Sequence, residues 1–334
     1  IDGKGPIAPG SAARALRAAP PPAPLRARLG STVDFGVRAL DAFSPVREGQ
    51  RIGIFSGSGI GKSSLLAMIA RNTACDSAVI ALVGERGREV REFIEDSLGE
   101  AGLSRAVVVV ATSDEPAMMR REAAYLAMTF AEYFRDEGDH VLCVMDSLTR
   151  VAAAQREIGL AAGEPPTAKG YTPSVFSLLP SLLERAGPGL DAPGAGAVTG
   201  VFSVLVEGGD HDEPIADAAR AILDGHIVLS RKIAERGRFP AVDILRSVSR
   251  SAPADEDRAR LAAAARRLAA VHDDMSEMIR IGAYKTGSNP EVDRAALFHV
   301  ELEAILSQGV EEKADAAAAM AMLNAALARV GEAA

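Results

Sequence analysis

A glycine-rich turn between two apolar segments constrains this chain more than any other stretch. Residues 52–55 before the turn are almost continuously apolar, which predicts a buried strand. After the turn, Leu65, Leu66, Met68 and Ile69 recur at helical spacing. A strand, a glycine loop, a Lys-Ser pair and a helix in that order form a phosphate-binding loop. The stretch therefore predicts a site for a nucleoside triphosphate.

Each part of this loop has a chemical reason. Glycines accept backbone angles that let successive N–H groups point at an anion, and the helix that follows adds the positive end of its dipole. Lys62 supplies a mobile charge for the β- and γ-phosphates, and Ser63 supplies a hydroxyl for Mg²⁺. The usual pattern begins with Gly where this chain has Ser56, a position that starts the turn and need not touch phosphate. The predicted nucleotide-binding residues here are Gly57, Ser58, Gly59, Ile60, Gly61, Lys62, Ser63 and Ser64.

Composition and charge limit the class of protein. The chain has 334 residues, 48% of them hydrophobic and 25% charged, as in a globular protein. Its formal net charge of −8 argues against nucleic acid as the main partner. Cys75 and Cys143 form no Cys-x-x-Cys pair and sit in or beside apolar runs, which favours reduced core thiols in a cytosolic protein. No apolar run reaches eighteen residues, the length a membrane-spanning helix needs.

The order of the segments predicts an α/β fold. Apolar strands at 78–83, 107–111 and 140–146 alternate with helical patterns, which indicates a mainly parallel sheet flanked by helices. From about residue 254 an Ala-, Arg- and Glu-rich helical pattern runs nearly to the end, broken at 287–290. We therefore expect three parts: an extended Pro-rich linker at 1–30, a P-loop NTPase domain at 31–252 and a helical domain at 253–334. Because the chain lacks an initiator Met, we expect the linker to follow a missing upstream domain.

Two carboxylates stand where a nucleotide-hydrolysing site needs them. Asp146 closes an apolar strand, the position from which a carboxylate holds Mg²⁺ near a phosphate loop. Glu85 directly follows the strand at 78–83 and could position the attacking water at the same sheet edge. Either residue could instead cap the helix that follows, and for Glu85 the residue pattern alone leaves both interpretations open.

A series of motifs resembles one known family. The stretches occur in the order 56–63, 84–86, 146–150, 170–174, 223–231, 239–243 and 247–250. The series is similar to that of the catalytic subunits of rotary ATP synthases, and most of all to the type III export ATPases of the bacterial flagellum. The resemblance covers essentially the whole chain and weakens after about residue 255. It implies a RecA-like core, Mg-dependent ATP hydrolysis, and a missing N-terminal β-barrel.

The resemblance also implies roles for single residues. Glu85 matches the glutamate that polarises the attacking water, and Asp146 the Mg²⁺ carboxylate. Arg86 and Arg150 match arginines that contact the γ-phosphate, and Arg250 matches the arginine finger that reaches into the neighbouring subunit's site. Two aromatic residues match the walls of the adenine pocket, Phe239 where Tyr is commoner, and Tyr284 opposite it.

The family implies partners as well. We expect a cytoplasmic homohexamer that binds ATP and ADP, assembles at the cytoplasmic face of the inner membrane and uses no specific nucleic acid. A central stalk protein, a regulatory stator protein and export chaperone–cargo complexes are the expected partners. The acidic loop containing Asp210 and Asp212 is a candidate contact for the stalk. Without the barrel, we expect the chain to be monomeric and to hydrolyse ATP weakly unless concentration or a partner drives assembly.

Several alternatives remain open at this stage. An injectisome ATPase shares nearly all of these motifs, and the catalytic subunit of a proton-translocating ATP synthase is the next nearest family. A noncatalytic regulatory subunit commonly lacks the carboxylate that this chain retains at Glu85. An RNA-driven hexameric helicase is disfavoured by the net charge and by the lack of an aromatic and basic RNA-binding platform.

Overall fold

The computed structural model describes residues 13–206, 213–250 and 255–332. Eight strands form one sheet in the order β10–β9–β3–β8–β6–β4–β5, with the short β7 paired to β8. The strands from β9 to β5 run parallel, while β10 and β7 are antiparallel to their neighbours. The bounds of the sheet strands are β3 Arg51–Ser56, β4 Ser77–Val83, β5 Ala106–Ala111, β6 His140–Asp146, β7 Gly187–Pro188, β8 Ala197–Leu205, β9 Gly225–Leu229 and β10 Val242–Ser249. A separate small hairpin joins β1 (Thr32–Val33) to β2 (Val46–Arg47).

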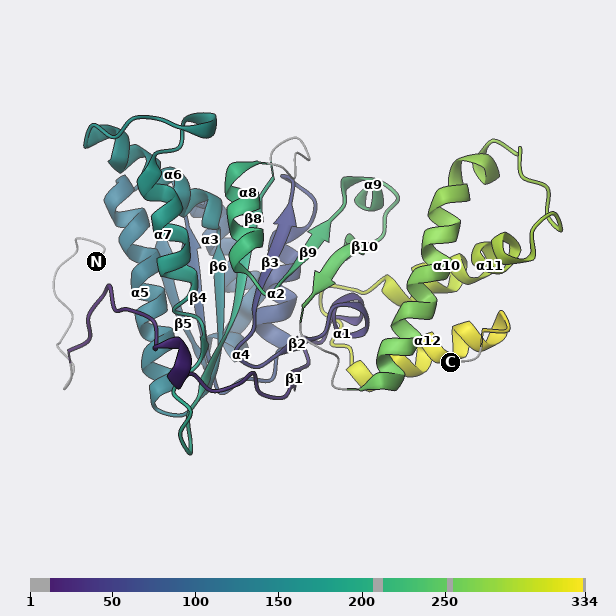
Figure 1. Cartoon of the computed structure of the whole chain (residues 1–334), viewed down its shortest axis with the longest axis horizontal. Helices are drawn as coiled ribbons and strands as arrows, with labels where there is room; N and C mark the ends of the chain where they lie inside the picture. Colours follow the sequence, from purple (N-terminus) through teal and green to yellow (C-terminus); the bar gives the residue numbers. More distant parts are fainter. Residues whose placement is uncertain (1–12, 207–212, 251–254, 333–334) are drawn as a thin grey trace.

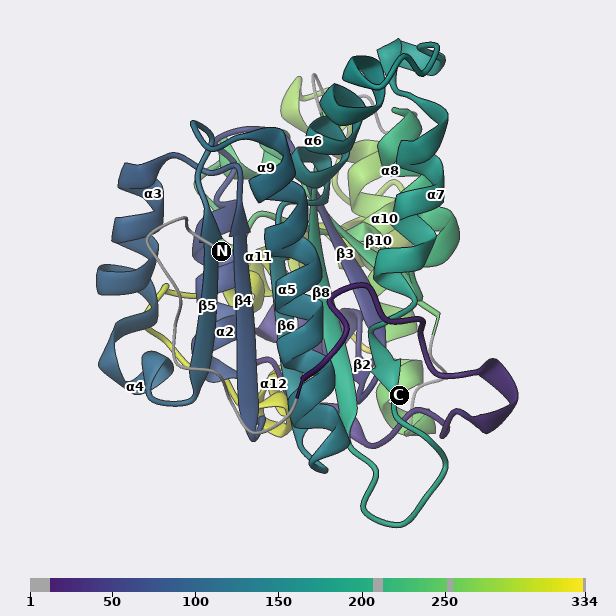
Figure 2. The same cartoon turned by 90° about the vertical axis from the view of Figure 1, so that its left-hand side faces the viewer.

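Helices cover both faces of the sheet (Figures 1 and 2). On one face lie α5 (Ala117–Asp136), α6 (Leu148–Ala161), α7 (Pro173–Leu183) and α8 (Pro214–Ile222). On the other lie α1 (Arg38–Phe43), α2 (Lys62–Asn72), α3 (Gly87–Glu92) and α4 (Gly99–Leu103). The short helix α9 (Arg231–Ala234) lies between β9 and β10. The predicted α/β fold with a mainly parallel sheet is confirmed.

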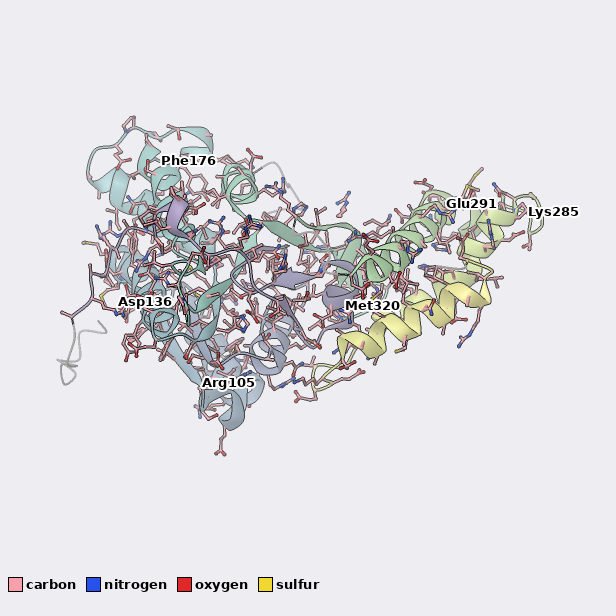
Figure 3. The ribbon with its side chains drawn as sticks, turned by 60° about the horizontal axis from the view of Figure 1, so that its bottom comes forward. Arg105, Asp136, Phe176, Lys285, Glu291 and Met320 are labelled. Carbon is pink, nitrogen blue, oxygen red and sulfur yellow. The ribbon has the colours of Figure 1, made fainter. Side chains whose placement is uncertain are left out.

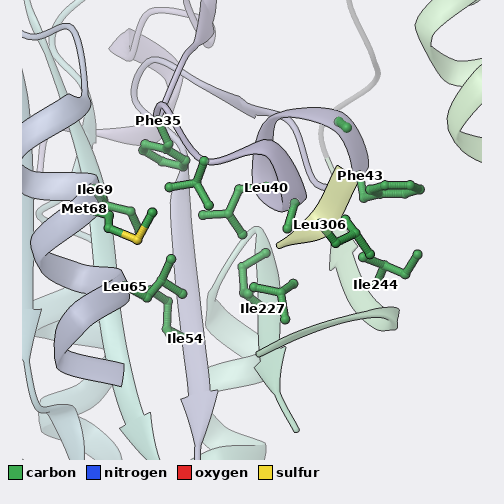
Figure 4. Close-up of a cluster of buried hydrophobic side chains, with 14 of the residues drawn as sticks. Phe35, Leu40, Phe43, Ile54, Leu65, Met68, Ile69, Ile227, Ile244 and Leu306 are labelled. Carbon is green, nitrogen blue, oxygen red and sulfur yellow. The ribbon is translucent and has the colours of Figure 1, made fainter. Parts of the chain in front are cut away.

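Three helices complete the chain: α10 (Glu256–Arg280), α11 (Pro290–Leu306) and α12 (Ala316–Arg329). They extend to one side of the sheet (Figure 1). Their apolar faces are nevertheless continuous with the sheet's own core, because Leu65 of α2, Ile227 of β9 and Leu306 of α11 belong to one buried cluster (Figure 4). The predicted boundary at 252/253 therefore separates two kinds of secondary structure that share a hydrophobic core.

The structure differs from the expected helix boundaries in two places. The helical pattern that we expect between the strands at 78–83 and 107–111 is split, with a π-helical turn at Phe93–Leu98 between α3 and α4. The C-terminal helices are broken a second time between α11 and α12. There Gln308 Nε2 donates to the carbonyl oxygens of Gly36 and Glu312, at 2.8 Å each, and Asp315 caps α12. The contact between Gln308 and Gly36 joins positions 272 residues apart in the sequence, which helical periodicity does not report.

The Pro-rich N-terminal segment has one 3₁₀ turn, Ala23–Leu25, in its described part, and a second such turn lies at Ala168–Gly170. The described part of the N-terminal segment runs beside α5 (Figure 2). Arg14 of this segment pairs with Asp136 of α5 at 2.6 Å.

Burial raises the pKa of the Cys143 thiol to about 12, and neither cysteine forms a disulfide. In the part of the chain that the structure describes, no helix is both long and apolar enough to cross a membrane.

Candidate nucleotide-binding site

The predicted phosphate loop joins β3 to α2 at the carboxyl edge of the parallel strands. Gly59 and Gly61 have φ of +74° and +86°, in the left-handed region that favours glycine. Gly61 precedes the first residue of α2, so the loop ends at the helix N-terminus. Ser63 and Ser64 are exposed in the first turn, whereas the side chain of Ile60 is buried and leaves its backbone to face a ligand. The loop thus has the backbone shape and the helix dipole that an anion needs.

Lys62 meets both predicted carboxylates. Its Nζ contacts Asp146 Oδ1 in a short ion pair and lies 3.5 Å from Glu85 Oε1. The three residues meet because β6 pairs with β4, so Asp146 at the end of β6 lies beside the segment that follows β4. The strand β3, which leads into the loop that carries Lys62, is separated from β6 by β8 alone. The structure therefore brings together the lysine and the two acids that the sequence singled out.

Asp146 is held in place from the other side. It is 3% exposed, and Ser203 on the adjacent strand β8 donates its hydroxyl to Asp146 Oδ1 at 2.6 Å. Sequence reasoning missed Ser203, because nothing local marks one serine of a buried strand as the partner of a distant carboxylate. Knowing the order of β6 and β8 would have been needed to find it.

The environment of Glu85 favours its protonated form. Burial raises the pKa of its carboxyl, and the negative charge of Asp146 raises it further, while Lys62 opposes both effects. A carboxyl whose pKa is raised toward neutrality is better suited to accept a proton at physiological pH than an ordinary glutamate. The arrangement can therefore orient and activate a water next to the phosphate loop.

The three predicted arginines lie at different distances from this cluster. Arg150, in the first turn of α6, packs against the segment after β4, since a Cβ built on Gly84 would lie 2.8 Å from Arg150 Cβ. Arg86 is largely exposed, with its Nη1 3.7 Å from Glu89. Arg250 follows β10, and its backbone N–H donates to the Asp224 carbonyl at 2.9 Å. The Asp224 N–H in turn donates to the carbonyl of Arg51, at the start of β3, so Arg250 lies at the opposite sheet edge from its own phosphate loop.

The two predicted adenine-pocket residues are far apart. Phe239 lies against the phosphate loop, because a Cβ built on Gly61 would come within 3.4 Å of the Phe239 ring. The residue is 44% exposed, and its carbonyl accepts from the Gln308 N–H at 2.8 Å. A flat, accessible ring beside the loop can stack on a base. Gln308, which sequence reasoning did not select, comes from the break between α11 and α12.

Tyr284 does not join the site. It lies in the turn between α10 and α11, where its hydroxyl donates to the Asn289 carbonyl or to Asp293, each at 3.0 Å. Figure 3 labels the next residue, Lys285, at the far end of the helical region. That Tyr284 forms the second wall of the adenine pocket stays a prediction. In the structure the hydroxyl stabilises the turn between α10 and α11. Motif matching does not distinguish such a structural contact from ligand binding.

No preformed metal cage accompanies these residues. Among residues 13–206, 213–250 and 255–332, no group of three or more His, Cys, Asp or Glu side chains could hold a metal ion. Ser63 and Asp146 supply one hydroxyl and one buried carboxylate. Such a set fits Mg²⁺ that arrives with phosphate oxygens and keeps several waters.

Comparison with known families decides the membership of the chain. Residues 36–249 match the model of the ATP synthase alpha/beta family, nucleotide-binding domain. The chain belongs to the ATP synthase alpha/beta family. Residues 254–325 match the T3SS EscN ATPase C-terminal domain, which places the chain among the export members of that family. The predicted resemblance to type III export ATPases is confirmed, and the chain carries the core of an ATP-hydrolysing enzyme.

Individual proteins of the ATP synthase alpha/beta family are similar to this chain over most of its length. The flagellum-specific ATP synthase of Caulobacter vibrioides is 56% identical over 317 residues, which is 93% of this chain and 71% of that protein. The Bacillus subtilis protein of the same name is 56% identical over 293 residues, 87% of this chain and 65% of that protein. The assembled ATPase EscN of enteropathogenic E. coli superposes with a TM-score of 0.89 at 43% identity, covering 97% of this chain and 78% of EscN.

Proposed function

We propose that this chain hydrolyses Mg-ATP at the interfaces of a homohexamer and thereby energises protein export through a flagellar type III secretion apparatus. The observation that carries the proposal is the cluster in which Lys62 of the phosphate loop meets Glu85 and Asp146. A protein that only binds nucleotide needs the lysine, whereas an enzyme that hydrolyses it also needs a carboxylate beside the γ-phosphate. Glu85 provides that carboxylate.

In this mechanism each residue has one task. The loop N–H groups and Lys62 hold the phosphates, and the Phe239 ring stacks on adenine. Asp146 and Ser63 would hold Mg²⁺, which would supply positive charge for the phosphate oxygens. Glu85 orients the attacking water and accepts its proton. Arg150 and Arg86 approach the γ-phosphate from the segments beside Glu85.

The position of Arg250 supports a shared site. Arg250 lies one strand length from its own phosphate loop, at the end where β3 begins, and its side chain is exposed. It therefore cannot stabilise the transition state of its own subunit without a large rearrangement. An exposed arginine at this edge is suited to enter the site of a neighbouring subunit as an arginine finger. One solved relative, EscN of enteropathogenic E. coli, is an assembled ATPase.

The flagellar system is favoured over the injectisome by similarity. The flagellum-specific relatives are 47–56% identical to this chain, whereas the EscN structures are 43–45% identical. One EscN structure includes its central stalk EscO, and we extend a central stalk partner to this chain. A regulatory stator protein, chaperone–cargo complexes and a location at the cytoplasmic face of the inner membrane complete the proposal. The candidate stalk contact at Asp210 and Asp212 lies outside the described residues.

Steady-state ATPase activity against protein concentration tests the shared site. We expect wild-type turnover per chain to rise with concentration as rings assemble, and both Glu85→Gln and Arg250→Ala to be nearly inactive. Mixing the two variants should restore activity, because an interface can then combine an intact Glu85 with an intact Arg250. Mixtures that stay inactive while forming hexamers would contradict the proposal.

The export role needs a separate experiment. A flagellum-specific ATP synthase whose matching part is replaced by residues 36–325 of this chain should restore swimming to a bacterium that lacks its own copy, and the same chimera with Glu85→Gln should not. Restored injectisome secretion without restored swimming would favour the injectisome alternative.

A further inference from the structure

The segment from Leu223 to Arg231 resembles the export family, yet nothing in the proposed mechanism uses it. In the structure this segment forms β9 and runs parallel to β3, with Gly53 opposite His226 and Ser56 opposite Leu229. Asp224, just before β9, accepts from the Arg51 backbone N–H at 2.9 Å and from its Nη2 at 3.2 Å. The segment therefore secures the start of the strand that leads into the phosphate loop.

Its other end contacts the loop itself. Arg231, the first residue of α9, donates from Nη2 to the Ser58 carbonyl oxygen at 3.1 Å. The same nitrogen would lie 3.7 Å from a Cβ built on Gly57. The backbone of Arg231 is itself anchored, because the preceding Ser230 N–H donates to the Ala241 carbonyl at 2.9 Å and the Ser230 carbonyl accepts from Ala234. A side chain on a fixed base can hold a loop carbonyl in a fixed direction.

That carbonyl belongs to the peptide unit between Ser58 and Gly59. A trans peptide is planar, so its C=O and its N–H point in opposite directions. Holding the Ser58 oxygen toward Arg231 therefore turns the Gly59 N–H to the other side. Gly59 has φ +74°, and a Cβ built on it would meet nothing within 4 Å. Sterics alone do not hold this peptide, and a reversed peptide would present a carbonyl oxygen to anionic phosphate.

We propose that Arg231 is a positioning residue that locks the Ser58–Gly59 peptide with its N–H directed at the bound phosphates. The inference rests on the assignment of residues 57–63 as the phosphate site. Arg231 acts through the backbone and need not touch nucleotide. Its neighbour Lys232 is also exposed and carries the same charge, but no hydrogen bond or ion pair joins its side chain to the described residues.

The binding affinities of two ligands distinguish a role of Arg231 at the phosphates from a general effect on the nucleotide site. Tripolyphosphate offers phosphates without a base, and ADP offers both. Arg231→Met should weaken binding of both ligands by about tenfold, because one charge-assisted hydrogen bond and the ordered peptide are lost. Arg231→Lys keeps a charged donor and should recover most of the affinity. Phe239→Ala should weaken ADP alone, because its effect is confined to the base.

The matched control is Lys232→Met, which removes the same charge one residue away and should bind both ligands as wild type does. Affinities are measured by titration calorimetry in Mg²⁺, with circular dichroism to confirm folding of each variant. Equal tripolyphosphate affinity for Arg231→Met and Lys232→Met would overturn the proposal. So would a loss for Arg231→Met that is restricted to ADP, or an Arg231→Lys variant that is folded but as weak as Arg231→Met. Failure of wild type to bind tripolyphosphate would instead contradict the assignment of the phosphate site.

Discussion

Two charge clusters in this protein, one fully buried and one partly buried, have opposite balances. Beside α5, Arg185 is fully buried and makes a two-pronged contact with Glu132 through its Nε, at 2.9 Å, and its Nη2. Two more of its N–H groups reach Thr129 and the Leu16 carbonyl, so four of the five guanidinium N–H groups have partners. This cluster, which we call the α5 pair, is neutral. At the phosphate loop, one lysine faces two carboxylates. That site cluster carries an excess of negative charge.

The difference separates a structural role from a functional one. A neutral buried ion pair whose groups are largely occupied by protein partners offers little to a ligand, and it holds the N-terminal segment against α5. In the site cluster, burial and the charge of Asp146 raise the pKa of Glu85 against the opposing effect of Lys62, which keeps a proton acceptor available at a cost in stability of the free protein. Removing a charge should therefore have opposite effects on stability in the two clusters.

The largest expected effect is on catalysis. Glu85→Gln should lower ATP turnover by about 10²–10⁴-fold, because the base that accepts the water's proton is lost. It should also raise the melting temperature of the nucleotide-free protein, since a destabilising buried charge becomes neutral. ATPase assays and thermal melts measure the two effects. Glu92→Gln, a half-exposed glutamate at the end of α3 that pairs with Arg88, is the control and should change neither. A Glu85→Gln variant that melts below wild type would contradict the contrast between the two clusters.

The α5 pair should respond in the opposite direction. Arg185→Met leaves Glu132 buried without its partner and should lower the free energy of unfolding by about 3–5 kcal/mol. Adding Glu132→Leu should recover much of this loss, because the unpaired charge disappears. Urea denaturation measures both changes. Arg91→Met breaks an exposed pair with Glu95 and should change the free energy of unfolding by less than about 1 kcal/mol. Equal effects for Arg185→Met and Arg91→Met would contradict the assignment.

The pH dependence of stability extends the contrast. The pKa of Glu85 is raised above its ordinary 4.5 in the folded state, so the folded protein binds more protons than the unfolded chain just above that pH. Wild type should therefore lose stability relative to Glu85→Gln as the pH rises from 4.5 through the raised value. Thermal melts between about pH 4.5 and 8 should show the difference in melting temperature widening with pH. A constant difference would mean that Glu85 ionises normally.

The smallest effect involves a third group, a pair of stacked histidines. His272 and His299 have ring centroids 3.6 Å apart and an interplanar angle of 14°. Burial lowers the pKa of both histidines. The charge of His299 lowers the pKa of His272 further, and the charges of Arg236 and Arg238 lower that of His299 further. The negative charge of Asp273 opposes the fall in both cases. Because the unfolded chain takes up protons below about 6.5 that the folded state resists, acid should destabilise the protein. His299→Phe keeps a stacking ring and should show a smaller fall in melting temperature between about pH 7.5 and 5.5. An unchanged fall would exclude the pair as the cause.

The parts of the site that are encoded locally could be predicted from the sequence. The phosphate loop follows from a strand, glycines and a helix that are adjacent in the chain. Asp146 and Glu85 follow from acids placed where apolar strands end, because the carboxyl ends of parallel strands share one edge. Phe239 and Arg250 needed the resemblance, since each by itself is an unremarkable aromatic or arginine.

Packing between elements selects the distant residues that serve these parts. Strand order places Ser203 on Asp146 and Arg231 on Ser58, and no local pattern specifies which strands become neighbours. The break after α11 brings Gln308 to Phe239, while the α10–α11 turn keeps Tyr284 away from the loop. Periodicity reports the face that a residue occupies within its own element. Contacts between elements depend on packing across the whole chain, so the partners of the site residues appear only in the folded protein.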